Sequence, residues 1–184
     1  MKQTYESMPL VDGLRRVLSN PQSWYNALFC GLIYLPTAAF GEYWGIQYLH
    51  HTNVLMDKHQ AVFAINMVFV GWAIGGIAIG AISDYMKLRR PLMLVTPILC
   101  LLALCPVLYW HTMPPLAVYV ALGIYGLCNS GLVLGYAVSG EINHQSVSGV
   151  SIAFCNMLSI MLGSLALPIV GWLLSSGETQ SVIT

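Results

Sequence analysis

The segment GWAIGGIAIGAISDYMKLRRP, from Gly71 to Pro91, contains the two features that decide the fold of this chain. Its first half is an uncharged apolar run, and glycines four residues apart on a helix let a second backbone approach closely. The predicted helix-packing glycines are Gly71, Gly75, Gly76 and Gly80. Its second half is a short hydrophilic turn with one aspartate and a basic cluster, and a further apolar run follows. The pattern predicts two membrane-spanning helices joined by a turn at the membrane surface.

The composition extends this interpretation to the whole chain. Of the 184 residues, 57% are hydrophobic and 8% are charged, and the mean hydropathy is +0.71. An ordinary soluble domain is about 45 to 50% apolar and about 25% charged. Apolar runs of about twenty residues match a hydrocarbon layer about 30 Å thick, in which a lone strand would lack hydrogen-bond partners. We therefore predict an all-α membrane protein, a bundle of about five transmembrane helices.

The predicted spans divide the chain into three parts. The spans are residues 24–48, 60–83, 91–110, 115–139 and 147–174, which together form one transmembrane domain, 24–174. Residues 1–23 are expected to form a cytoplasmic leader with an amphipathic helix at the membrane surface. The apolar face of that helix contains Leu14, Val17 and Leu18, and the opposite side contains Arg15 and Arg16. Residues 175–184 are expected to be a short polar tail.

Lysine and arginine predict the orientation of the chain. With a cytoplasmic N-terminus, only Lys58 lies outside, and six basic residues lie inside: Lys2, Arg15, Arg16, Lys87, Arg89 and Arg90. The positive-inside rule favours this arrangement. The N-terminal residues have no apolar region followed by a small-residue cleavage site, so the first span is expected to act as the insertion signal. We expect an integral multi-pass protein of a bacterial inner membrane.

Several functional classes are disfavoured by the sequence. Seven basic and seven acidic residues balance, so no basic surface is expected to bind nucleic acid. The five cysteines lie in apolar runs without a CxxC pair and are interpreted as packing residues. His50, His51 and His59 lie near Asp57, but their spacing matches no established zinc pattern. We expect no metal, no cofactor and no enzymatic activity.

The turn between the second and third spans resembles a motif of the major facilitator superfamily. That family's short cytoplasmic loops read approximately G-x-x-x-D-R-x-G-R-R-R-P. The matching positions in this chain are Gly80, Asp84, Arg89, Arg90 and Pro91, and the departures are Tyr85, Lys87 and Leu88. At the end of the fourth span, Glu141 and Gly149 also fit the second half of such a transporter. The stretch PTAAFGEYWG further resembles bacterial nutrient permeases, including the phagosomal amino-acid transporter group.

The resemblance implies a fragment of a secondary active transporter. It identifies the five spans with helices seven to eleven of twelve, so an N-terminal half and a twelfth helix would be supplied by other chains. In this family a small solute binds between two six-helix halves that rock about it, often with proton coupling. The expected partners are therefore the lipid bilayer, a small solute, protons and the complementary transporter half or another membrane chain.

The resemblance places the cavity between the first and fourth spans. On the fourth span Tyr125, Asn129 and Tyr136 lie within about 40° of one another on the helix surface. On the first span Tyr34 and Thr37 flank a proline that can kink the helix. We expect these five residues to be cavity candidates. The alternative for Asn129 is a packing hydrogen bond to a neighbouring helix.

Glu42 is the remaining acidic candidate within a span. It lies roughly 27 Å along the first predicted helix, near the outer surface, with Tyr43, Trp44 and Tyr48 around it. One interpretation is a carboxylate at the headgroup boundary, among aromatic residues typical of that depth. The other is a group that couples protons or binds a cationic part of the solute.

The charged residues at the cytoplasmic end also have two interpretations. The resemblance implies that Asp84, Arg89, Arg90 and Glu141 latch the cytoplasmic gate, whereas the alternative is that they only set topology.

A second class of function also stays open for the whole chain. It could be a non-transporting membrane interaction module, or a truncated remnant, that assembles with other chains through its glycine faces.

Overall fold

The computed structural model describes the backbone of residues 9–183 and the side chains up to residue 172. Every regular element in this part of the chain is a helix. In chain order the elements are α1 (Leu10–Leu18), α2 (Pro21–Pro36), the π-helix η1 (Thr37–Trp44), α3 (Gly45–Thr52), α4 (Lys58–Met86), α5 (Arg89–Tyr109), α6 (Pro115–Asn129), α7 (Leu132–Glu141), the 3₁₀-helix η2 (Gln145–Val147) and α8 (Ser148–Ile183).

Four helical segments of the described chain are long and apolar enough to cross a membrane. They are Lys58–Met86, Arg89–Tyr109, Pro115–Glu141 and Gln145–Trp172. Each overlaps one of the last four predicted spans. The all-helical membrane class is therefore confirmed, and the number of qualifying helices is four where about five were expected. Helix α8 continues to Ile183, beyond the predicted end of the fifth span at residue 174.

The first predicted span is helical but divided. Helix α2 contains 16 residues and passes directly into the π-helix, which is followed by α3. Pro36 lacks an N–H, so the Leu32 carbonyl loses its usual helical partner at this point. Gly45 then faces the carbonyl of Phe40, five residues earlier, where a side-chain carbon would collide. Pro36 thus explains where the wider π-helical turns begin, and Gly45 explains why these turns fit without a steric clash.

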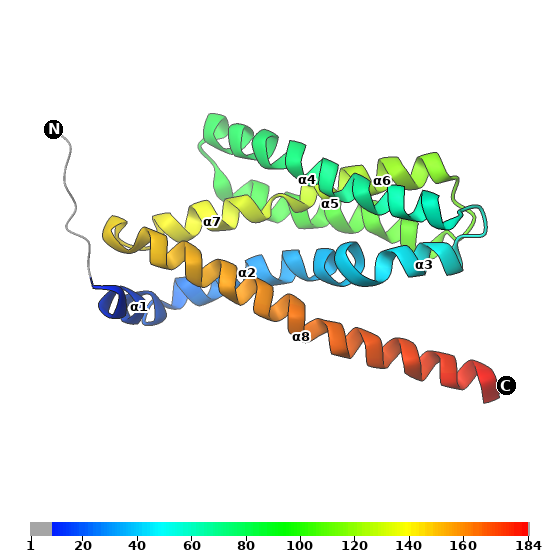
Figure 1. The fold of residues 1–184 in the computed structure, drawn as a ribbon. Coiled ribbons are helices and arrows are strands. Elements are labelled where there is room, and N and C mark those ends of the chain that lie inside the picture. The colour runs from blue at the N-terminus through cyan, green and yellow to red at the C-terminus, as the bar shows by residue number, and fades with distance from the viewer. Residues whose placement is uncertain (1–8, 184) are drawn as a thin grey trace.

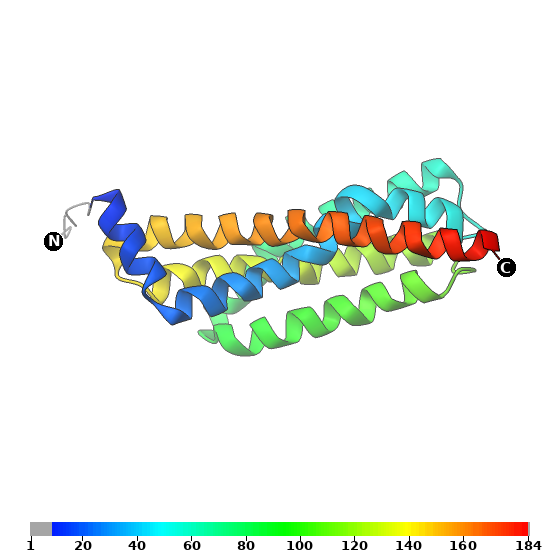
Figure 2. The same ribbon diagram turned by 90° about the horizontal axis from the view of Figure 1, so that it is seen from below.

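The helices form a bundle in which the fourth predicted span is central (Figure 1). Helix α6 packs against α4 and α5, and α7 packs against α2 and α8. Helices α2 and α8 also lie side by side in Figures 1 and 2. A short break separates α6 from α7, where the N–H of Gly131 bonds the carbonyl of Cys128, three residues back.

Two apolar clusters form the core. One lies among α3, α4, α5 and α6 and includes Val68, Leu104 and Leu122. The other lies among α1, α2, α7 and α8 and includes Val17 and Phe154. The amphipathic helix α1 buries Val17 completely, while Leu14 and Leu18 stay about 40% exposed. Because α1 reaches the second cluster through Val17, it is fixed to one end of the bundle (Figure 1).

Candidate functional site

A buried polar network joins the first and fourth predicted spans. The Thr37 hydroxyl donates to Asn129 Oδ1 at 2.8 Å and lies 2.9 Å from the Tyr125 hydroxyl. Asn129 Nδ2 donates to the Ile33 carbonyl at 2.7 Å, and Trp72 Nε1 donates to Asn129 Oδ1 at 3.2 Å. Thr37, Tyr125 and Asn129 are at most 3% exposed. The amide of Asn129 therefore holds α2, η1, α4 and α6 together.

A second set of polar side chains lies on the more exposed side of the same helices. Tyr34 donates its hydroxyl to Glu42 Oε1 at 2.7 Å, and Tyr136 donates to Asn156 Oδ1 at 2.9 Å. Glu42 and Asn156 are exposed, whereas the two tyrosines are half-buried. Both tyrosines, Asn156, Trp72 and Ser159 are among the residues that line a cavity of about 150 Å³. Since one water molecule occupies about 30 Å³, this cavity holds about five waters or a small organic group.

The five cavity candidates are thus divided between two settings. Thr37, Tyr125 and Asn129 lie in the buried network, and Tyr34 and Tyr136 lie on the open side. The sequence analysis did not identify Trp72, Asn156 or Ser159. Asn156 and Ser159 could have been found as polar residues one turn apart in the apolar run FCNMLSI. The indole of Trp72 gave no such signal because tryptophan is common in membrane helices.

The four packing glycines of α4 also divide into two pairs. A side-chain carbon at Gly71 would collide with the backbone of Gly123, and one at Gly75 with the backbone of Leu127. Gly76 has no described neighbour within 4 Å of a side-chain carbon built on it, and neither does Gly80. One glycine pair therefore brings α4 close to α6, and the other pair forms an open small-residue surface.

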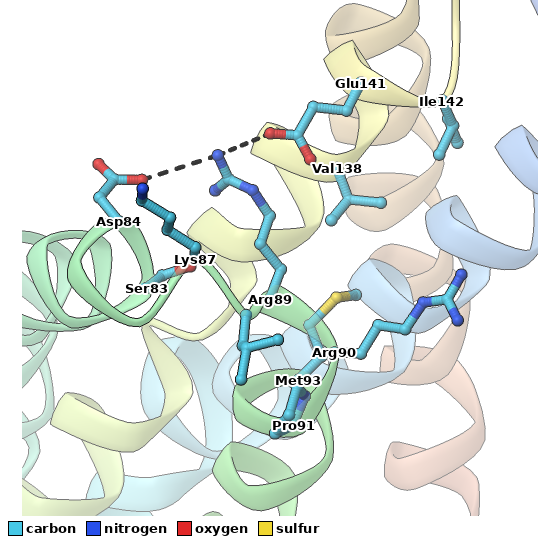
Figure 3. Close-up of a pocket in the computed structure, with 11 residues that line it drawn as sticks. Ser83, Asp84, Lys87, Arg89, Arg90, Pro91, Met93, Val138, Glu141 and Ile142 are labelled. Carbon is cyan, nitrogen blue, oxygen red and sulfur yellow. Dashed lines mark ion pairs between the residues drawn. The ribbon is translucent and has the colours of Figure 1, made fainter.

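Charged residues meet at the end of the bundle that also contains α1 (Figures 1 and 3). An Arg89 nitrogen lies 2.7 Å from Glu141 Oε1 and 3.7 Å from Asp84 Oδ1. One guanidinium thus joins the end of α4, the start of α5 and the end of α7. In Figure 3 the Arg90 side chain points away from this group. The surrounding pocket has a volume of about 770 Å³ and includes Ser83 and Lys87.

The turn before α5 has a defined backbone geometry. Lys87 ends α4 with a φ of 52°, in the left-handed region. This residue is at the position where the family motif has glycine, the residue that adopts such a conformation most easily. The lysine keeps the turn in the shape that a glycine would give it, at some cost in strain. As a result Arg89 begins the next helix beside Asp84.

In the described part of the chain, no three His, Cys, Asp or Glu side chains converge in a way that would hold a metal ion. His50 and His51 lie at the end of α3, with ring centroids 5.4 Å apart. Asp57 is engaged elsewhere, because its carboxylate accepts from the Gln60 backbone N–H and caps α4.

Comparison with known proteins adds no relative. No family model matches the chain, and no curated protein or solved structure gives a significant match.

Proposed function

We propose that this chain is part of a secondary active transporter of the major facilitator type and moves a small solute by alternating access. The observation that supports this proposal best is the ion pair of Arg89 with Glu141. These residues belong to the two sequence stretches that resemble the family, and they are 52 positions apart in the chain. An ion pair at the end of three helices can hold one side of a transporter closed and open when the helices separate.

The open polar side supplies the groups for the solute. Tyr34, Tyr136 and Asn156 present hydroxyl and amide groups at a small cavity, with the indole of Trp72 beside them. Glu42 accepts a hydrogen bond from Tyr34, so protonation of Glu42 would remove its charge and alter this contact. We propose that Glu42 takes part in proton coupling or in binding a cationic group of the solute.

The first predicted span supplies a place to bend. Pro36 directly precedes the π-helix, which contains both Thr37 of the buried network and Glu42, and π-helical segments occur frequently at functional sites. We propose that α2 and α3 change their relative angle here during transport. A membrane crossing by the first predicted span, residues 24–48, the inner-membrane location and the cytoplasmic N-terminus belong to the same proposal.

A second candidate function is supported by Gly76 and Gly80. Their open surface on α4 would allow a helix of another chain to approach closely. A membrane interaction module without transport would use this surface in the same way. The two candidates therefore differ in solute flux and not in assembly.

The test begins with the coding DNA on both sides of this segment, read for a six-helix half and a further helix. The segments found are co-expressed with this chain in cells, and uptake of candidate nutrients is measured with and without a protonophore. We expect saturable uptake that requires both chains and falls at least tenfold when Arg89 is changed to Gln. A stable complex without flux would contradict transport and support the interaction module.

A matched control separates the charge of Arg89 from general effects of charge removal. Arg16→Gln removes one positive charge from the exposed surface of α1 at the same end of the bundle. It should leave uptake within twofold of the unaltered chain. Equal losses in both variants would show that the latch contacts are not specific.

A further inference from the structure

A long groove lies between α2 and α5, beside the charged end of the bundle. Its first part has a volume of about 490 Å³ and is lined on the α2 side by Gln22 and Tyr25 and on the α5 side by Arg90 and Leu94. Its second part, of about 300 Å³, continues between Leu32 and Leu101. Phe29 lines both parts, so the two lie next to each other along α2 and α5.

The length of the groove matches one leaflet of a bilayer. On α5 its lining extends from Arg90 to Leu104, which is about 21 Å at 1.5 Å per residue. A bilayer including its headgroups is about 40 to 45 Å thick, so one leaflet is about 20 to 22 Å. Beyond this point the Tyr48 hydroxyl bonds the Leu108 carbonyl at 2.5 Å and joins α3 to α5. A spanning helix would need the whole membrane depth, whereas a lipid chain needs one leaflet.

The polar end of the groove carries the positive charge of Arg90, and no acidic side chain of the lining neutralises this charge. Arg90 has no ion-pair or hydrogen-bond partner among the described residues. The nearby carboxylates of Asp84 and Glu141 are engaged by Arg89, and Arg90 points to the other side, toward α2 (Figure 3). The lining of the first part of the groove contains no acidic residue. An arginine in this position suits a phosphate, which it can bind through two parallel hydrogen bonds.

We infer that this groove binds one anionic phospholipid of the leaflet at the basic end of the bundle. Its phosphate contacts Arg90, with Gln22 and Tyr25 beside the headgroup, and one acyl chain lies along Phe29, Leu94 and Leu101. The basic end supports the choice of an anionic lipid, because five of the six described lysine and arginine residues lie there. The inference goes beyond the proposed transport and does not depend on it.

The test measures which lipids stay bound to the purified chain. The protein is exchanged into detergent with equal amounts of phosphatidylglycerol and phosphatidylcholine, and retained lipid is counted by native mass spectrometry. Both lipids carry a phosphate that Arg90 can bind, but only phosphatidylcholine carries a cation beside it, which repels the arginine, so we expect about tenfold preference for phosphatidylglycerol. Arg90→Gln should remove the preference, while Arg16→Gln, with the same loss of charge on exposed α1, should keep it.

A second pair of variants tests the acyl-chain part without changing charge. Leu94→Trp places a large ring in the groove, whereas Leu102→Trp places the same ring on α5 outside it. Both leucines are exposed, at 70% and 66%, so both variants should fold with unchanged helicity. We expect only Leu94→Trp to reduce retention severalfold. Equal retention of both lipids, equal effects of the paired variants, or crosslinking of position 94 to a second protein chain in place of lipid would overturn the inference.

Discussion

Tyr34 and Thr37 lie one turn apart on the same continuous helical stretch, yet they face different surroundings. Thr37 is 3% exposed and bonds Asn129 inside the bundle. Tyr34 is half-buried and bonds the exposed Glu42. Helix α4 shows the same division, since Gly71 contacts α6 and Gly76 faces no described neighbour. One side of the bundle is thus packed within this chain, and the other side exposes polar and small residues.

The largest expected effect separates the two glycine environments. Gly71→Ala should lower the free energy of unfolding by about 2 to 3 kcal/mol, because its methyl group would meet the Gly123 backbone, which cannot move aside. Gly76→Ala should raise it by up to about 1 kcal/mol, because alanine favours the helix and nothing is displaced. Reversible denaturant unfolding in mixed micelles, followed by circular dichroism, measures both. Changes of the same sign would break the distinction between the two sides.

A smaller effect is expected from the two asparagines. Asn129→Ala should lower the free energy of unfolding by about 1 to 2 kcal/mol, because Ile33, Thr37 and Trp72 all lose a hydrogen-bond partner. Asn156→Ala removes one exposed contact to Tyr136 and should change stability by less than about 0.5 kcal/mol. The same unfolding assay compares them. If Asn156 proved as costly as Asn129, the open side would be as structural as the buried one.

The smallest expected effect concerns the ion pairs at the basic end. Glu141→Gln should lower the free energy of unfolding by less than about 1 kcal/mol, because both partners are partly exposed to water. Asp84→Asn should cost less, since its carboxylate is 76% exposed and lies 3.7 Å from Arg89. Unfolding at low and high salt tests the cause, because added salt should shrink both differences. Effects that persist unchanged at high salt would point to packing instead of charge.

The sequence predicted much of the backbone and little of the contact pattern. The last four predicted spans each overlap an apolar helix long enough to cross a membrane. The division of the first span at Thr37 and the break after Asn129 were not predicted. Pro36 indicated a possible kink, but a π-helix also depends on how Gly45 and Phe40 pack. A hydropathy value is summed over a window of many residues. It therefore does not detect a local change in backbone hydrogen bonding, such as the π-helix or the break after Asn129.

The sequence by itself determined that this chain is helical, apolar and basic at one end, because these properties follow from composition and from the order of residues. The tertiary structure alone decided that Asn129 faces Thr37, that Arg89 reaches Glu141 and that Arg90 faces a groove. The reason is the rotation of each helix about its own axis. Adjacent residues on a helix point about 100° apart, so the side chains that meet depend on how each helix turns against its neighbours.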